Sequence, residues 1–346
     1  MAEISPYYSD ILALFGSDLP WEKISESKIL ITGSAGLIGS SIVDALLINP
    51  RRDYEVYASG RDISHLKKRF YRFNDDSGLH FLKYDVQSPL NSDECFDFII
   101  HAASNASPSS FVNSPVEVMK SNLYGICNLL DYGRSNGMKR LLYISSGEVY
   151  GQGDGREFSE DYSGYVNCTL SRSCYPSSKR AAETLCASYK AEYGVDVVIA
   201  RPCHTYGPYF TESDNRAFAQ FIRAILNDED IIMKSTGEQL RSWCYVVDCV
   251  SAILHILLKG KSGEAYNIAD PHSSVTIKEL ASIIANLGEK RIILATPQLM
   301  EKQGYNPVTT SVLSSSKIRS LGWAPMTPLK DGLKHSIEEI CNNSKV

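Results

Sequence analysis

Residues 28–39 read Lys-Ile-Leu-Ile-Thr-Gly-Ser-Ala-Gly-Leu-Ile-Gly, and they are the strongest indication of the fold in this chain. Its apolar start predicts a buried strand, and the apolar spacing over 37–47 predicts a helix. In the turn between them, Gly33 permits the tight bend, Gly36 lets a pyrophosphate approach backbone N–H groups, and Gly39 lets the helix pack on the strand. An ordinary tight turn is the alternative, but the strand–turn–helix context favours dinucleotide binding. The remaining predicted contacts in the turn are Ala35, Leu37 and Ile38.

Strand and helix patterns alternate downstream of this turn. The predicted strands are 55–60, 79–86, 96–104, 140–147 and 195–202, and the predicted helices include 64–73, 116–135 and a helix that carries Tyr175. Apolar strands without strict alternation, each followed by a helix, indicate a parallel sheet covered on both faces. We therefore predict an α/β fold, a Rossmann-type doubly wound parallel sheet with a smaller C-terminal substrate-binding lobe.

The domain boundaries follow from where the alternation begins and fades. Residues 1–27 form a predicted helical extension with an amphipathic helix near 7–15, for which packing or an oligomer contact is favoured over catalysis. Residues 28–203 form the predicted dinucleotide-binding domain. Residues 204–346 form mainly the substrate-binding lobe, with some segments expected to return to the sheet.

Composition limits the classes of partner. The chain has 346 residues, and its formal net charge of -5 argues against a broad surface for nucleic acid or anionic membrane. Its nine cysteines form no CxxC pair and indicate buried thiols in a reducing compartment. Because the N-terminus lacks a basic region and no apolar run reaches 18 residues, we expect a cytoplasmic protein with no membrane segment. We expect no metal.

Tyr175 and Lys179 are the candidate catalytic pair. Four residues on a helix place the phenol and the ammonium about 6 Å apart on one face. A phenol that acts as a base near neutral pH must lose about three units from its usual pKa of about 10, and a nearby Lys cation lowers the pKa in that direction. Such a pair is common on surface helices. The catalytic interpretation of the pair is supported by Ser146 and Glu148, which end a buried strand at the sheet edge where ligands bind. The simpler alternatives are that Ser146 caps its own turn and that Glu148 is a solvated carboxylate.

The end of the second strand normally distinguishes NAD from NADP, because a carboxylate there binds the adenosine ribose and an Arg meets a 2′-phosphate. Here Arg61 and Asp62 follow one another, so we predict NAD with NADP as the alternative because of Arg61. Asp85 and Val86 are candidates for the border of the adenine, and an ordinary polar strand end explains them equally well. The other predicted cofactor contacts are Ala102, Ala103, Ser104, Asn122 and Ser145.

Several segments together resemble the extended short-chain dehydrogenase/reductase superfamily, in which nucleotide sugars are modified. They are GSAGLIG at 33–39, HAASNASPSSF at 101–111, SSGEVYG at 145–151, RSCYPSSKRAAETL at 172–185 and QLRSWCYVVD at 239–248. In their order along the chain and in their amino-acid sequence, these segments are most similar to those of UDP-glucuronate decarboxylases. The resemblance covers the chain from about residue 28 almost to the C-terminus.

This resemblance implies roles for individual residues. Tyr175 takes the proton of the sugar C4 hydroxyl while the C4 hydride passes to NAD, and Lys179 holds the nicotinamide ribose. Ser146 contacts the same hydroxyl, Glu148 assists around C5, and Arg241 lies near the sugar and its phosphates. The implied substrate is a nucleotide sugar, with a UDP-linked sugar favoured, and the implied assembly is a homodimer formed by the helices at 116–135 and 175–193. The further implied substrate contacts are Ser107, Arg172, His204 and Arg216.

Four positions depart from the decarboxylase pattern. Gly147 replaces a Ser, and Pro-Ser-Ser at 176–178 replaces an acidic, glycine-containing spacer. His204 stands where the family tends to have Asn, although an ordinary core histidine is the slightly favoured explanation. TYGPYF at 205–210 lacks an Arg after the Pro. A nucleotide-sugar 4,6-dehydratase or a 4-epimerase is therefore the alternative enzyme. A catalytically silent NAD(P)-binding sensor or scaffold is the alternative of another class, and it predicts loss of the Ser, Tyr and Lys set, which is intact.

Overall fold

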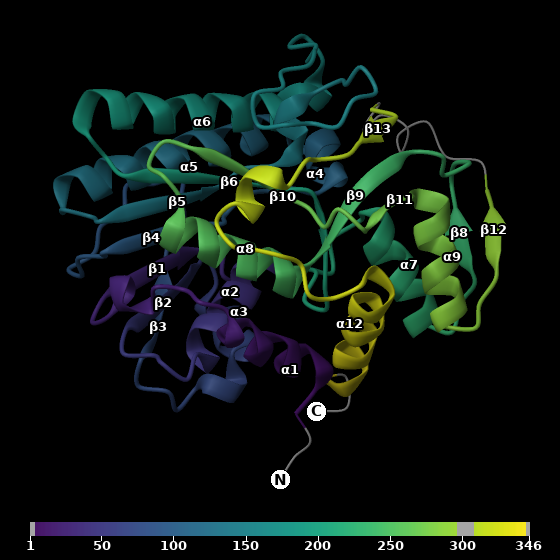
Figure 1. Ribbon diagram of the computed structural model, residues 1–346, viewed down its shortest axis with the longest axis horizontal. Helices are drawn as coiled ribbons and strands as arrows, with labels where there is room; N and C mark the ends of the chain where they lie inside the picture. Colours follow the sequence, from purple (N-terminus) through teal and green to yellow (C-terminus); the bar gives the residue numbers. More distant parts are fainter. Residues whose placement is uncertain (1–3, 296–307, 344–346) are drawn as a thin grey trace.

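The computed structural model describes residues 4–295 and 308–343, and its centre is a seven-stranded parallel sheet (Figure 1). The strand order is β10-β6-β5-β4-β1-β2-β3. The order reverses between β1 and β4, and in such sheets ligands bind beyond the carboxyl ends of the strands at this point. The strands are β1 (Lys28–Thr32), β2 (Glu55–Gly60), β3 (Leu79–Lys83), β4 (Phe98–His101), β5 (Arg140–Ile144), β6 (Val197–Pro202) and β10 (Ala265–Ile268). The predicted Rossmann-type fold is confirmed.

Helices cover both faces of this sheet (Figure 1). One face carries α5 (Pro115–Ser135) and α6 (Cys174–Tyr193), which lie side by side, and the short α4 (Pro108–Asn113). The other carries α2 (Leu37–Ile48), α3 (Ile63–Arg69) and α8 (Val246–Lys259). The central strands are buried almost throughout, because each face packs against helices, and this explains their continuous apolar runs.

The smaller lobe is built around several short strands. β9 (Leu240–Tyr245) pairs with β7 (His204–Tyr206), β11 (Ser274–Thr276) and β13 (Thr310–Ser311), and β8 (Ile231–Met233) pairs with β12 (Ile292–Leu294). The lobe therefore begins with a strand directly after residue 203. Strands of two or three residues are too short to display a period and form because a partner strand is present. The lobe's helices are α7 (Ala217–Leu226), α9 (Ile277–Leu287) and α12 (Leu329–Asn343), whereas the short α11 (Ser316–Arg319) contacts β10 and α8 beside the central sheet.

The N-terminal extension forms the predicted helix, α1 (Pro6–Ala13), which packs against α2 and α12. The Tyr7 hydroxyl donates to Oδ2 of Asp44 at 2.8 Å, and Arg69 forms a buried ion pair with the same carboxylate. The Arg69 guanidinium lies 3.5 Å from the ring centroid of Tyr209, whose hydroxyl donates to Glu339 on α12 at 2.6 Å. The extension thus ties the sheet domain to the C-terminal helix, and among the described residues it supplies none to the cavity described below.

No helix in the described part of the chain has the length and apolar character needed to cross a membrane. All nine cysteines lie within the described residues, and each is a free thiol.

Candidate active site

A cavity of about 770 Å³ lies between the carboxyl edge of the sheet and the smaller lobe. The glycine turn, the ends of β2, β4 and β5, the start of α6, and β7, β8 and β9 all contribute to its lining. Most of the residues singled out from the sequence line it: Gly36, Leu37, Ile38, Gly39, Arg61, Ala102, Ser104, Ser107, Ser145, Ser146, Glu148, Arg172, Tyr175, Lys179, His204, Arg216 and Arg241.

Six predicted cofactor contacts do not line the cavity: Gly33, Ala35, Asp85, Val86, Ala103 and Asn122. The buried Asn122 amide instead accepts a hydrogen bond from Ser104 at 2.8 Å and donates to Ser178 at 2.9 Å. Its contacts therefore position a lining residue and connect α5 to α6. Asp85 accepts from the backbone N–H of Gln87 at 3.0 Å and so caps a local turn.

The glycine turn fits a dinucleotide. Gly33 has φ +70°, and a Cβ there would lie 2.7 Å from Cα of Ala103, so that only glycine allows this approach of β4. A Cβ on Gly39 would lie 2.2 Å from the carbonyl oxygen of Gly33. Helix α2 starts after Gly36 without a side-chain cap, which leaves its first N–H groups for an anion such as a pyrophosphate.

Tyr175 lies in the first turn of α6, 6% exposed, with its ring stacked 4.8 Å from that of Phe111. Burial, with a smaller effect of the Glu148 charge, raises its pKa to about 12, while hydrogen bonding to Ser146 and the charges of Arg216 and Arg172 act in the opposite direction. This rise in the pKa of Tyr175 is opposite to the decrease expected from the Tyr–Lys spacing. The physical reason is that the protein groups alone do not offset the loss of water around the phenol.

Lys179 is 1% exposed, and its Nζ donates to the carbonyl oxygen of Ile144 at 2.8 Å. Nζ lies 5.8 Å from the ring centroid of Tyr175, close to the separation expected on one helix face. Burial lowers the pKa of Lys179 to about 7, so near neutral pH the side chain is only partly charged.

Glu148 is held by an ion pair that the sequence did not reveal. Oε1 of Glu148 lies 2.9 Å from a guanidinium nitrogen of Arg172, with 22% and 15% of the two side chains exposed. The Arg172 guanidinium also lies 4.5 Å from the ring centroid of Phe111, which in turn stacks on Tyr175. The Ser146 hydroxyl accepts from the backbone N–H of Glu148 at 3.1 Å, so the predicted turn cap is present. These contacts bring the hydroxyl, carboxylate and phenol to one wall of the cavity.

Gly147 has a packing explanation. A Cβ at this position would lie 3.1 Å from a methyl carbon of Leu313, another residue of the cavity lining. The glycine therefore leaves room for Leu313. A serine here would have to displace that side chain by a few tenths of an ångström.

Arg241 on β9 is a buried cation without a carboxylate partner among the described residues. It is 4% exposed, and its guanidinium donates to the carbonyl oxygens of Leu240 at 2.8 Å, Thr309 at 3.0 Å and Val308. Burial lowers its pKa to about 10, with Glu148 acting in the opposite direction. Because carbonyl dipoles only partly replace water around the guanidinium, an anion in the cavity would be stabilised beside it.

His204 is neutral at physiological pH. Burial lowers its pKa to about 3, and the charges of Arg241 and Arg216 add to this effect. Its ring centroid lies 5.2 Å from that of Trp243. It lines the cavity without a charge, and a hydrogen bond with the backbone of Ser242, which acts to raise its pKa, engages one ring nitrogen.

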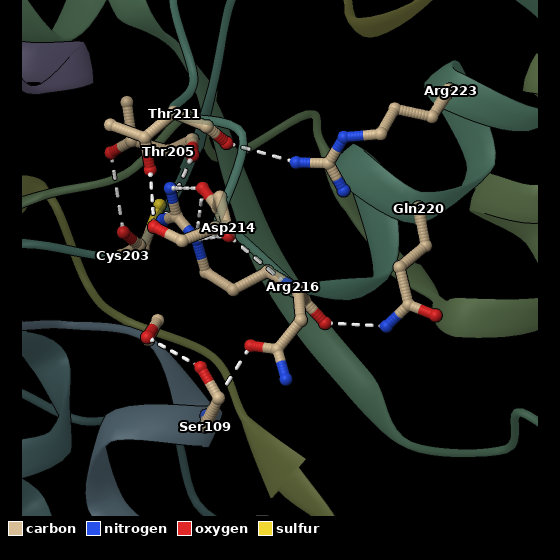
Figure 2. Close-up of polar contacts among 11 residues, drawn as sticks. Ser109, Cys203, Thr205, Thr211, Asp214, Arg216, Gln220 and Arg223 are labelled. Carbon is tan, nitrogen blue, oxygen red and sulfur yellow. Dashed lines mark hydrogen bonds and ion pairs between the residues drawn. The ribbon is translucent and has the colours of Figure 1, made fainter. Parts of the chain in front are cut away.

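Arg216 is paired within its own loop (Figure 2). Its guanidinium forms an ion pair with Asp214 at 2.5 Å and also donates to the carbonyl oxygen of Thr205 at 3.5 Å. Figure 2 also shows Ser109 facing this loop, with its N–H donating to the Asn215 side chain at 3.4 Å. Ser109, Asn215, Phe111, Trp243 and Leu313 line the cavity and were not predicted, because no local pattern distinguishes them from ordinary loop or core residues.

The parallel sheet, the glycine turn and the Tyr–Lys pair at the strand ends define a Rossmann-type dinucleotide-binding enzyme. The chain belongs to the NAD dependent epimerase/dehydratase family, whose sequence profile matches residues 29–269.

Two named relatives and one solved structure show the extent of the similarity. The chain is 33% identical over 309 residues to UDP-glucuronic acid decarboxylase 6 of Arabidopsis thaliana, covering 89% of this chain and 87% of the relative. It is 32% identical over 312 residues to UDP-glucuronic acid decarboxylase 1 of Xenopus tropicalis, covering 90% and 71%. A dTDP-glucose 4,6-dehydratase from Streptomyces venezuelae superposes with a TM-score of 0.81 at 24% identity, covering 92% of this chain and 98% of that chain, which supports the fold.

Proposed function

We propose that this protein is an NAD-dependent nucleotide-uronate decarboxylase, converting a substrate of the UDP-glucuronate type to a pentose of the UDP-xylose type through a transient 4-keto sugar. The observation that carries the proposal is the one cavity that Tyr175, Ser146 and Lys179 line together with the ion-paired Glu148 and the buried Arg241. The names of the relatives support the same reaction.

NAD, when bound, supplies the acceptor for the C4 hydride and its later return. In this proposal Tyr175 removes the proton of the C4 hydroxyl, and Ser146 orients that hydroxyl. The buried Lys179, fixed by the carbonyl of Ile144, is placed to bind a ribose hydroxyl of the dinucleotide. Because the pKa of Tyr175 is about 12 within the protein alone, base action near neutral pH requires further positive charge beside the phenol, which charged Lys179 and a nicotinamide cation would supply.

A C4 ketone makes the C6 carboxylate part of a β-keto acid. The C5–C6 bond breaks, CO2 leaves, and the electron pair remains on the sugar as an enolate, which must then be protonated at C5. In this proposal the Glu148–Arg172 pair lies beside C5 and governs that proton, while Arg241 stabilises negative charge on the substrate. The requirements are positioning and electrostatic stabilisation, which a fixed set of buried charges provides.

A 4,6-dehydratase is the alternative function, and one observation bears on it. A dehydratase must protonate the departing C6 hydroxyl, and Gly147, beside Glu148, has no side chain that could donate a proton. Among the described residues, the ion-paired partner of Glu148 is Arg172, and a guanidinium is a poor proton donor to a leaving group. A 4-epimerase has no evident use for the Glu148–Arg172 pair.

The test is incubation of the purified protein with UDP-glucuronate and NAD, with CO2 and a UDP-pentose measured by mass spectrometry. Substrate labelled with ¹³C at C6 should release labelled CO2, and Tyr175→Phe is the matched inactive control. Conversion of a neutral nucleotide hexose to a 4-keto-6-deoxy sugar, with no turnover of any uronate, would replace the decarboxylase by the dehydratase.

The proposed assembly is a homodimer formed through α5 and α6. These adjacent helices expose Val116, Met119, Tyr124 and Tyr193, which supports an apolar contact. We also propose a cytoplasmic location, which the nine free thiols support. Light scattering of the wild type and of Tyr124→Glu would test the dimer, since a charge in the interface should produce a monomer.

A further inference from the structure

The adenosine end of the cavity differs from the arrangement expected for NAD alone. Strand β2 ends at Gly60, and the next residue, Arg61, lines the cavity. In parallel sheets of this type, the side chain just after the second strand meets the adenosine ribose, where a carboxylate selects the 2′-hydroxyl and an arginine a 2′-phosphate. The chain places an exposed arginine at this point.

The neighbouring carboxylate is engaged elsewhere. Oδ1 of Asp62 accepts hydrogen bonds from the N–H groups of Ser64 at 2.8 Å and His65 at 3.2 Å, and so caps α3. Asp62 is also absent from the cavity lining, as far as the structure describes it. The carboxylates in the described lining are Glu148 and Asp214, and each forms an ion pair with an arginine. No carboxylate of the described lining is therefore available to a ribose 2′-hydroxyl.

Arg61, by contrast, makes no hydrogen bond, ion pair or ring contact with another described residue. Its five N–H donors form a planar fork that matches phosphate oxygens in a two-point contact. The chain as a whole carries a formal charge of -5, so a dianionic group needs a local cation of this kind.

We propose that Arg61 forms a 2′-phosphate subsite, so that this chain binds 2′-phosphorylated dinucleotides such as NADP at least as tightly as NAD. The proposal rests on the cavity being the dinucleotide site and is independent of the sugar chemistry. The 2′-phosphate is remote from the nicotinamide ring, so hydride transfer is the same for both dinucleotides. Asp62 contributes by capping α3 instead of facing the ribose.

The test is calorimetric binding to the full chain, without any sugar substrate. The affinity for NADP⁺ is compared with that for NAD⁺. The affinity for adenosine 2′,5′-bisphosphate is compared with that for ADP, because both of these fragments lack the nicotinamide. Arg61→Ala removes the guanidinium, and Arg61→Lys keeps the charge without the fork. The matched control is Arg51→Ala, which removes an exposed arginine at the opposite end of β2.

The wild type should bind NADP⁺ at least as tightly as NAD⁺. Arg61→Ala should weaken NADP⁺ and the bisphosphate by roughly tenfold or more, as expected for a charge-assisted contact, while NAD⁺ changes less than about twofold. Arg61→Lys should recover part of the loss, and the control should match the wild type. Equal weakening of both dinucleotides, or weaker binding of the bisphosphate than of ADP by the wild type, would overturn the proposal. If NADP⁺ binding depends on Arg61 but the protein releases no CO2 from UDP-glucuronate, only the proposed function is overturned and the 2′-phosphate subsite stands.

Discussion

The buried Lys179 should make the protein less stable at low pH than it would be with an apolar side chain. Nζ has one partner, the carbonyl of Ile144, and burial lowers its pKa from the ordinary 10.5 to about 7. Below about pH 7 both the folded and unfolded states carry the proton, so the folded state bears the full cost of the buried charge. That cost is about 5 kcal/mol at about 1.4 kcal/mol for each unit of pKa.

The sign follows from proton binding. Between about pH 7 and 10.5 the unfolded chain holds a proton that folded Lys179 has released, so the free energy of unfolding rises with pH. Integration over pH 6 to 9 gives a rise of roughly 2–3 kcal/mol from this side chain. Lys179→Met keeps the apolar stem and removes the charge, and should abolish this contribution.

The assay is urea unfolding of the wild type and Lys179→Met at several pH values between 6 and 9. The difference between the two free energies of unfolding removes the contributions of other titrating groups. The free energy of unfolding of the wild type minus that of the variant should increase by roughly 2–3 kcal/mol from pH 6 to pH 9. At pH 6 the variant should be the more stable of the two proteins. Turnover by the variant should be lost.

The control is Lys190→Met, on the same helix with its side chain exposed, which should leave the pH dependence unchanged. A difference curve for Lys179→Met that is flat to within about 0.5 kcal/mol would show that Lys179 keeps its proton throughout, and would refute the argument.

Three other predictions concern the cavity. Tyr175→Phe should lower kcat by about 10²–10⁴-fold, as for loss of a general base, with unchanged NAD affinity by calorimetry; retained turnover would remove Tyr175 from that role. Arg172→Gln removes one of the charges that lower the pKa of Tyr175, so the rise of kcat with pH should move to higher pH, and Arg172→Lys should restore it; an unshifted profile would contradict the coupling. Gly33→Ala should abolish dinucleotide binding, measured by fluorescence, and cost more than about 1 kcal/mol of stability because a Cβ would meet Ala103; normal binding would mean that the turn tolerates a side chain.

Local patterns were enough for much of the fold. The helix predicted over 37–47 is Leu37–Ile48, and the helix predicted over 116–135 is Pro115–Ser135. The strand predicted over 55–60 is Glu55–Gly60. Such elements are long enough to display their period, whereas β7, β8 and β13 are not.

The glycine turn, the alternation of strands and helices, and the residue types at the strand ends could be predicted without a structure, because each depends on neighbours a few residues away. Which charges meet depends instead on contacts between distant parts of the folded chain. The Glu148–Arg172 ion pair joins residues 24 apart, and the carbonyls of Val308 and Thr309 that hold Arg241 come from residues 67 and 68 positions further along the chain. Burial likewise raises the pKa of Tyr175 and lowers that of Lys179, and neither shift could be predicted from local sequence, because the loss of water around a side chain depends on the packing of the whole domain.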